Sequence, residues 1–272
     1  MREITNLNQL LPHEASDIAF VPTMGALHAG HSKLIERARQ CSSNVLVSVF
    51  INPLQFGDPV DLEKYPRNPE ADARVAEQSG ATILWRPEFK EIYPSQIEFI
   101  SAGPLGELFE GVSRKGHFDG MLTVVNRLFN LVAPQWAVFG EKDFQQLFLV
   151  EQMVRRQGKK IEIVPVPTVR DVDGLALSSR NIRLTDEDRI AARVISRALV
   201  KASMADSLKE MQEQLDKTLA QEPRFTRDYS AIIDEENFAL ASEQSAAIRA
   251  LVAGWVSGVR LIDNMAMWNQ SR

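Results

Sequence analysis

Residues 17–40 read DIAFVPTMGALHAGHSKLIERARQ, and they contain the signals of a strand, a loop and a helix in that order. Residues 18–21 form a short apolar run, which predicts a buried strand. Residues 22–30 hold one proline and two glycines, so the strand is expected to end there in a loop. From about His31 onward, apolar and charged residues alternate at helical spacing, which predicts a helix.

The junction between this loop and this helix carries two histidines, His28 and His31. Phosphate groups are stabilised at such a junction because the first N–H groups of a helix lack partners and carry partial positive charge. Gly25 and Gly30 would let a ligand approach the main chain closely. The helix dipole should lower the pKa of a histidine there, and bound polyphosphate should raise it. We therefore predict a phosphate site, with the alternative that the histidines only cap the helix.

The composition is that of an ordinary globular protein, with 272 residues, 44% of them hydrophobic and 25% charged. A net charge of −5 and a pI near 5.5 lack the basic surplus of a nucleic-acid-binding protein. The single cysteine, Cys41, excludes an intramolecular disulfide. The first residues do not resemble a signal peptide and no apolar run is long enough to span a membrane, so we expect a cytoplasmic protein without membrane partners.

Strand-like and helix-like segments alternate along the first two thirds of the chain. Predicted strands at residues 45–51, 82–85, 136–139 and 161–166 follow the first one, and predicted helices cover residues 69–78, 121–131 and 143–157. This alternation predicts an α/β fold with a doubly wound parallel sheet and helices on both faces.

Ligands of such sheets lie beyond the carboxyl ends of the strands, and the predicted loops there hold most of the chemically useful residues. These residues are Met24, His28 and His31, then Asn52 and Gln55, then residues 140–143, then residues 168–170 and 177–180. We expect all four loops to open on one edge of the sheet.

Residues 174–181, GLALSSRN, form a second informative stretch. Two hydroxyls and a planar guanidinium suit phosphate oxygens, although a polar surface loop would have a similar composition. Asp171 and Asp173 are spaced like metal ligands, but a turn beside Gly174 is the preferred interpretation.

The alternation of strand-like and helix-like segments ends near Arg183, where we place a domain boundary. Thr185 and the acids after it are typical of a helix start. Residues 1–183 are predicted to form the nucleotide-binding and catalytic domain. Residues 184–272 are predicted to form a smaller α+β domain that closes over the site.

Several ordered motifs together resemble one family. PTMGALHAGH resembles the HxGH signature of the nucleotidyltransferase superfamily, and the whole set resembles the pantoate–β-alanine ligases, the pantothenate synthetase family. The other motifs are FINPLQFG at residues 50–57, YPRN at 65–68, GHFDG at 116–120, FGEKDFQQ at 139–146, ALSSRN at 176–181, PRFTRDY at 223–229 and RLIDN at 260–264. Arg127 and Leu177 depart from the usual pattern, where lysine and methionine are expected.

The resemblance implies a Rossmann-like fold and a two-step reaction. The carboxylate of pantoate attacks the α-phosphate of ATP to give pantoyl adenylate and pyrophosphate, and the amine of β-alanine then displaces AMP to give pantothenate. It also implies Mg²⁺ that arrives with ATP, no dedicated metal ligands, and a homodimer. Two alternatives stay open, a transferase acting on a phosphorylated acceptor and a nucleotide-binding module without catalysis.

The resemblance also implies roles for single residues. The catalytic residues would be His28, His31, Lys142 and Arg180, with His31 in the position usually assigned as proton donor. Pantoate would bind to Asn52, Gln55 and Gln146, and Gln55 would also face β-alanine. The ATP site would comprise Pro22, Met24, Gly25, Ala26, Leu27, His28, Ala29, Gly30, His31, Gly140, Glu141, Lys142, Asp143, Val169, Leu177, Ser178, Ser179 and Arg180.

Overall fold

The computed structural model describes residues 1–57 and 59–267, and the chain falls into two compact units, Met1–Pro167 and Thr168–Arg272. The units divide before Thr168, whereas the sequence pattern changes near Arg183. The two positions differ because the intervening residues pack with the second unit. Arg170 forms an ion pair with Asp263, and Leu175 lies in the second unit's core.

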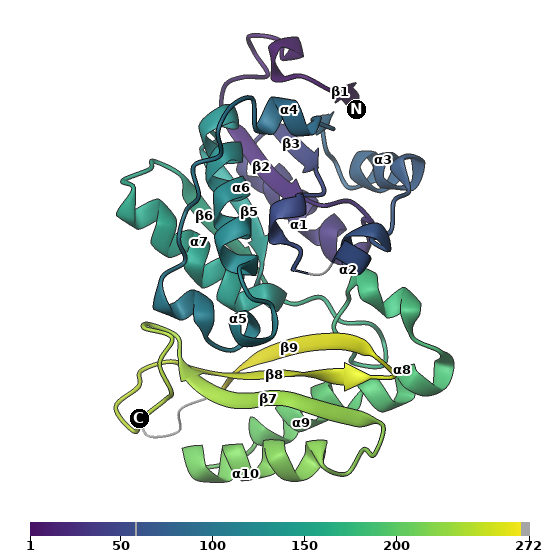
Figure 1. Ribbon diagram of the computed structural model, residues 1–272, viewed down its shortest axis with the longest axis vertical. Coiled ribbons are helices and arrows are strands. Elements are labelled where there is room, and N and C mark those ends of the chain that lie inside the picture. The colour runs from purple at the N-terminus through teal and green to yellow at the C-terminus, as the bar shows by residue number, and fades with distance from the viewer. Residues whose placement is uncertain (58, 268–272) are drawn as a thin grey trace. The chain divides into compact units, whose positions relative to one another are not determined.

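The first unit is built on a six-stranded sheet in the order β1-β4-β3-β2-β5-β6, and every neighbouring pair is parallel. This confirms the predicted parallel sheet (Figure 1). The strands are β1 (Arg2–Ile4), β2 (Ile18–Thr23), β3 (Asn44–Val49), β4 (Ile83–Trp85), β5 (Trp136–Gly140) and β6 (Glu162–Val166).

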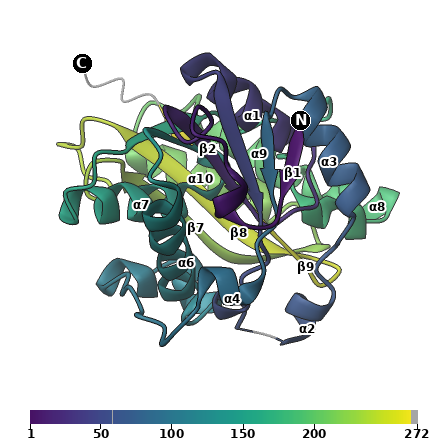
Figure 2. The same cartoon turned by 90° about the horizontal axis from the view of Figure 1, so that it is seen from above.

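Helices cover both faces of this sheet (Figure 2). α1 and α3 lie on one face, where they pack on Val45 and Val47, and α6 and α7 lie on the other, where they pack on Leu46. The strands are apolar on both sides because each side meets a helix layer. The α-helices of this unit are α1 (Ala29–Cys41), α2 (Pro59–Glu63), α3 (Pro69–Gln78), α4 (Phe89–Ile92), α5 (Glu110–Ser113), α6 (His117–Val132) and α7 (Phe144–Arg156).

Short 3-10 helices complete the connections, and the helix ends are set by local signals. α3 begins after Asn68, whose side chain accepts the Ala71 N–H, so both of its predicted ends are confirmed. α6 begins before its predicted start, because Gly116 adopts a left-handed φ of +73° just ahead of His117. The 3-10 helices are η1 (Leu7–Gln9), η2 (Pro53–Gln55), η3 (Pro104–Glu107), η4 (Glu141–Asp143) and, in the second unit, η5 (Ser179–Arg183).

The second unit has an α+β architecture, as predicted. Three helices, α8 (Asp186–Ala192), α9 (Val194–Ala202) and α10 (Leu208–Leu219), precede an antiparallel sheet in the order β7-β8-β9. Its strands are β7 (Phe225–Asp234), β8 (Ile248–Val256) and β9 (Val259–Met267). Thr185 caps α8 by accepting the Asp188 N–H, which confirms the predicted helix start.

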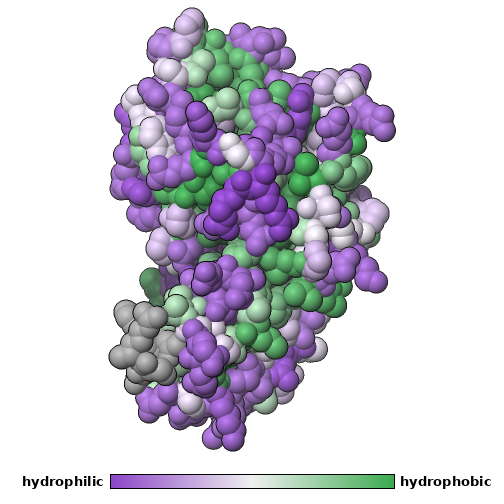
Figure 3. Space-filling model, turned by 90° about the vertical axis from the view of Figure 1, so that its left-hand side faces the viewer, coloured by the Kyte–Doolittle hydropathy of each residue, from purple (hydrophilic) through white to green (hydrophobic). Residues whose placement is uncertain are grey.

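Polar and apolar residues are interspersed on the molecular face drawn in Figure 3. Over the stretches that the structure describes, none of the helices combines the length and hydropathy needed to cross a bilayer.

Candidate functional site

The loop between β2 and α1 is fixed by hydrogen bonds on both sides. The Thr23 hydroxyl donates to the Ser48 carbonyl at 2.7 Å and accepts the Gly25 N–H at 3.2 Å. Gly25 and Ala26 then take left-handed φ values of +84° and +51°. Left-handed backbone is easy for glycine and unfavourable for alanine, so the surroundings must hold this conformation.

His28 and His31 cap the helix that follows this loop. The Nδ1 atom of His28 accepts the Gly30 N–H at 3.1 Å, and Nδ1 of His31 accepts the His28 N–H at 3.2 Å. The two rings lie with their centroids 4.2 Å apart. The two histidines therefore do cap the helix, and this capping leaves a phosphate site possible because it uses only their Nδ1 atoms. Because both Nδ1 atoms accept, the proton of each neutral ring sits on Nε2, which makes Nε2–H the available donor.

Both imidazoles are held in the neutral form. Burial is the main cause, and it lowers the pKa of His28 from its ordinary value of 6.5 to about 4 and that of His31 to about 3. The positive charge of Lys142 lowers both pKa values further, and for His31 the neighbouring His28 also contributes. The direction of the shift is the predicted one, and burial is its largest cause.

Lys142 reaches the same edge of the sheet from the end of β5. It lies in η4, its side chain is 19% exposed, and its Nζ is 3.8 Å from Oδ1 of Asp143. Its positive charge contributes to the lowered pKa of both histidines, so the ammonium group lies within electrostatic range of the two imidazoles. The sequence singled out these same three side chains in this unit.

Asn52 follows β3, caps η2 and is wholly buried. Its Nδ2 donates to Oε1 of Gln55 at 3.2 Å and to the Gly120 carbonyl at 3.0 Å. Its Oδ1 accepts the Leu54 N–H at 3.3 Å and the Tyr93 hydroxyl at 3.2 Å. Burial raises the pKa of Tyr93, so its phenol stays protonated and able to donate. With its amide fully used inside the protein, Asn52 positions Gln55 instead of offering a hydrogen bond to a ligand.

Gln55 is held from three directions. Its Oε1 accepts from Asn52, its Nε2 lies 2.9 Å from the Met24 sulfur, and its carbonyl lies 2.8 Å from Nδ1 of His117. Arg114 donates to Nε2 of His117 at 2.9 Å, so His117 carries its proton on Nδ1 and donates to Gln55. The motif at residues 116–120 signalled this region, although sequence reasoning assigned His117 no role.

Gly120 permits the close contact between α6 and the loop that carries Gln55. A Cβ at position 120 would overlap the Leu54 carbonyl oxygen and would lie 2.8 Å from the Gln55 nitrogen. The absence of a side chain at this one position therefore sets how closely the loop approaches α6.

The two neighbouring glutamines of α7 differ in their surroundings. The Gln145 amide is buried, accepts the Glu110 N–H at 3.2 Å and donates to the carbonyls of Leu105 and Leu108 at 2.9 Å each. Gln145 thus anchors the segment before α6. Gln146 is partly exposed, which fits a side chain that contacts a ligand.

Arg127 stands where the family pattern led us to expect a lysine. Its Nε donates to the Ile92 carbonyl at 2.7 Å, so the guanidinium holds the end of α4. This contact gives the arginine a structural role within the first unit.

The remaining predicted ATP residues lie in the second unit. Leu177 N–H donates to the Val169 carbonyl at 2.9 Å, so these two residues close a short hairpin. Ser178 caps η5 by accepting the Arg180 N–H at 3.3 Å.

The turn beside Gly174 forms as the sequence predicted. Asp171 and Asp173 flank it, and both carboxylates bind Arg189. Among the residues covered by the structure, no cluster of His, Cys, Asp or Glu is placed to hold a metal ion.

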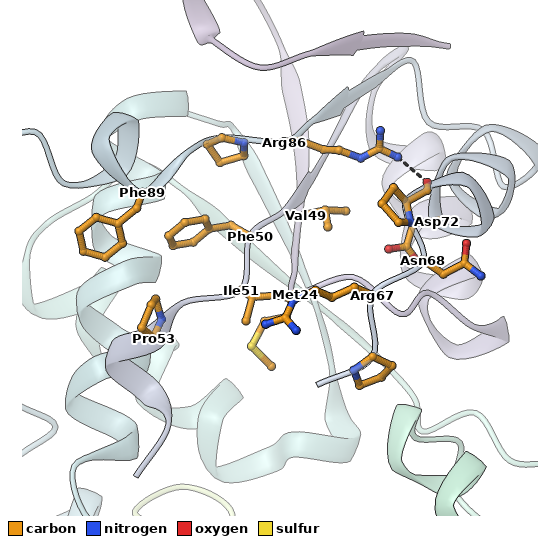
Figure 4. Close-up of a pocket in the computed structure, with 13 residues that line it drawn as sticks. Met24, Val49, Phe50, Ile51, Pro53, Arg67, Asn68, Asp72, Arg86 and Phe89 are labelled. Carbon is orange, nitrogen blue, oxygen red and sulfur yellow. Dashed lines mark hydrogen bonds between the residues drawn. The ribbon is translucent and has the colours of Figure 1, made fainter. Parts of the chain in front are cut away.

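A cavity of about 360 Å³ opens beside the histidine loop. Its walls are mostly apolar, and the rings of Phe50 and Phe89 face Asn68 and Asp72 across it (Figure 4). Met24, which contacts Gln55, also lines this cavity.

A parallel sheet with an imidazole-bearing loop at its carboxyl edge defines a Rossmann-like α/β protein. Comparison with known families makes the assignment specific. The family model described as pantoate-beta-alanine ligase matches residues 1–266. The chain belongs to the pantoate–β-alanine ligase family.

Individual relatives agree with this assignment. Pantothenate synthetase from Thermus thermophilus is 46% identical over 275 residues, which cover 97% of this chain and 98% of the relative. A crystal structure of the Thermus thermophilus enzyme superposes with a TM-score of 0.92, at 44% identity, covering 97% and 99% of the two chains. A Francisella tularensis pantoate-beta-alanine ligase, solved in complex with beta-gamma ATP and beta-alanine, has a TM-score of 0.79 at 33% identity and covers 98% and 97%.

Proposed function

We propose that this chain condenses pantoate with β-alanine, consumes ATP, and proceeds through pantoyl adenylate with release of pyrophosphate and then AMP. The observation that carries the proposal is the pair of neutral histidines, His28 and His31, beside Lys142 at the carboxyl edge of the sheet. Membership of the ligase family supplies the substrates.

In the first step negative charge shifts onto the pyrophosphate as the carboxylate of pantoate attacks the α-phosphate. The Nε2–H groups of His28 and His31 donate to phosphate oxygens, and the ammonium of Lys142 neutralises the charge that develops. A ring whose pKa lies near 3 is a weak base and is not protonated at neutral pH. In the absence of ATP, His31 is therefore neutral, and its Nε2–H is available to donate a hydrogen bond to a phosphate oxygen. Pyrophosphate leaves readily and does not need a transferred proton.

Pantoate is held by neutral amides. Gln55 and Gln146 bind its hydroxyl and carboxylate groups, while Asn52 and His117 fix the orientation of Gln55. In the second step the amine of β-alanine approaches the acyl carbon from the side of Gln55 and AMP leaves. Alignment of the two substrates supplies a large part of the rate enhancement.

The second unit completes the ATP site in this proposal. Val169 and Leu177 contact the adenosine, and Ser178, Ser179 and Arg180 contact the phosphates. The predicted domain made by residues 184–272 closes over the intermediate and excludes water, which would otherwise hydrolyse the adenylate. Mg²⁺ enters with ATP and keeps several of its waters. The chain acts in the cytoplasm, where ATP is supplied, and as a homodimer.

The test of this function measures two products of ATP, pyrophosphate and AMP. Purified protein is mixed with ATP, Mg²⁺ and pantoate, and pyrophosphate and AMP are measured with and without β-alanine. We expect a burst of pyrophosphate in the absence of β-alanine, and sustained AMP release that depends on it. AMP release that does not depend on β-alanine would contradict the ligase proposal. Transfer to a phosphorylated acceptor, tested in parallel, would identify the other type of transferase.

A further inference from the structure

A buried carboxylate lies directly behind the histidine loop. Asp72 belongs to the first turn of α3 and is 3% exposed. Its Oδ1 accepts the Leu27 N–H at 2.7 Å, and its Oδ2 accepts the Ala26 N–H at 3.2 Å. Within residues 1–57 and 59–267, no lysine, arginine or histidine forms an ion pair with it. Main-chain N–H groups therefore hold this carboxylate.

The carboxylate also sets the shape of the loop backbone. A Cβ at Gly25 would lie 2.9 Å from Oδ2 of Asp72, so the loop packs too closely against the carboxylate to accommodate a side chain at this position. Ala26, at φ +51°, adopts a conformation that an alanine does not choose unaided. The two hydrogen bonds to Asp72 favour this conformation over the relaxed alternatives.

Each main-chain donor from Gly25 to His28 is used inside the protein. The Gly25 N–H goes to Thr23, those of Ala26 and Leu27 go to Asp72, and that of His28 goes to His31. In glycine-rich phosphate loops such groups cradle the phosphate itself. Here an anion of the protein occupies them, so the loop can recognise phosphate through its imidazole Nε2–H groups. The direction of those groups depends on the backbone that Asp72 holds.

We propose that Asp72 is a positioning residue for the nucleotide step, which fixes residues 25–28 so that His28 and His31 point their Nε2–H groups at the phosphates. The inference rests on the proposed function for its substrate. It assigns Asp72 no contact with ATP. Asp72 acts through the loop. It lies close to Asn68, the last residue of the YPRN motif, which caps the same helix (Figure 4).

The test compares Asp72→Asn and Asp72→Ala with the unaltered protein. Asparagine keeps the shape and one acceptor oxygen, whereas alanine removes both acceptors. We expect KM for ATP to rise about tenfold in Asp72→Asn and further in Asp72→Ala, because the loss of charge-assisted hydrogen bonds weakens the loop. KM for β-alanine should change less than about twofold. In NMR titrations, the pKa of His31 should move back toward its ordinary value as the loop loosens.

Asp234→Asn is the matched control. Asp234 is also buried and accepts two main-chain N–H groups, those of Glu236 and Asn237, but it lies in the second unit. We expect a lower melting temperature in this variant with unchanged KM for ATP. If the Asp72 variants likewise lose only thermal stability, with KM for ATP and the histidine titrations unchanged, the positioning role is refuted. Asp72→Asn decides the question even if Asp72→Ala does not fold.

Different results would contradict the proposed ligase function and the proposed positioning role of Asp72. If the unaltered protein forms no pantothenate, the proposed function fails. The NMR titration of His28 and His31 needs no substrate, so it still tests whether Asp72 holds the loop.

Discussion

Each imidazole of the histidine loop uses its Nδ1 lone pair to cap α1, which leaves its Nε2–H as the donor of the ring. In the proposed function, one side chain serves the helix through Nδ1 and the phosphates through Nε2–H. The lowered pKa values keep both rings neutral. A neutral ring has the unprotonated Nδ1 that the cap requires, and its Nε2–H is sufficient as a hydrogen-bond donor.

Replacement of His31 by alanine should therefore affect both stability and turnover. Loss of the cap is expected to cost about 1 kcal/mol of unfolding free energy. Loss of the donor should lower kcat by roughly a hundredfold or more. Chemical denaturation and steady-state kinetics measure the two effects. His13→Ala, at an exposed histidine in the first unit, is the control and should change neither. Normal turnover in His31→Ala would contradict the assignment.

His28 and His31 also make the free energy of unfolding depend on pH, and this free energy should fall as the pH is lowered. In the unfolded chain both histidines bind a proton near pH 6.5, but in the folded protein they do so only near pH 4 and pH 3. The unfolded state therefore binds more protons between these values. Their contribution to stability is fully present above pH 6.5 and is lost as the pH falls, by at most about 1.4 kcal/mol per pH unit for each ring.

Urea unfolding at pH 7, 6 and 5 measures this dependence. The double variant His28→Ala/His31→Ala should be less stable at pH 7 and should lose less stability on acidification. An equal slope in the double variant and the unaltered protein would show that other groups are responsible. ATP, if it binds as proposed, should raise both pKa values, which NMR titration of the complex would detect.

At the scale of elements, the strands and helices of the first unit follow from sequence patterns, while the contacts between them do not. The pattern and caps of α3 fix it at both ends. Nothing in that pattern distinguishes Asp72 from an ordinary acid in a first helical turn, which the dipole alone would favour. Its hydrogen bonds to Ala26 and Leu27 join residues 46 and 45 positions apart, and only the folded sheet brings them together.

The same limit applies to the amides. The sequence does not distinguish the roles of Asn52, Gln55, Gln145 and Gln146. The structure buries the first three, and the amides of Asn52 and Gln145 form hydrogen bonds inside the protein. Spacing could predict that these residues gather at one edge. Which of them faces a ligand depends on packing that has no local signature.

The close contact at Gly120 gives a prediction at this scale. Gly120→Ala should displace η2 and Gln55, because the new methyl group would overlap the Leu54 carbonyl. We expect a loss of about 2 kcal/mol or more in stability and a larger rise in KM for pantoate than for ATP. Gly158→Ala is the control: its φ of +59° is strained for alanine, but no atom lies within 4 Å. It should cost stability without altering either KM. Unchanged pantoate kinetics in Gly120→Ala would contradict the link to Gln55.

At the scale of the whole molecule, each unit has its own hydrophobic core. The first surrounds the parallel sheet, and the second lies between α8–α10 and the antiparallel sheet. The sequence pattern changes near Arg183 because strand–helix alternation ends there, while the compact units divide before Thr168. The Arg170–Asp263 ion pair accounts for the difference, since it joins residues 93 positions apart and has no local signal.

Separate cores predict that residues 1–167 fold when produced alone. This fragment keeps both histidines and Lys142, so NMR titration of His28 and His31 in it shows how much of the lowering of their pKa values arises within the first unit. It should bind ATP more weakly than the full chain and form no pantothenate, since Ser178, Ser179 and Arg180 are absent. Circular dichroism, NMR titration and calorimetry provide the measurements. Full activity in the fragment would refute the proposal that the second unit contributes residues to the ATP site.

The capped histidines also bear on metal selectivity. Two adjacent imidazoles would ordinarily chelate soft divalent ions such as zinc, which coordinate through an unprotonated ring nitrogen. In this loop both unprotonated nitrogens already accept N–H groups from the main chain. Coordination would require either a broken helix start or the removal of a proton from Nε2. The capped histidine pair is therefore expected to bind zinc weakly.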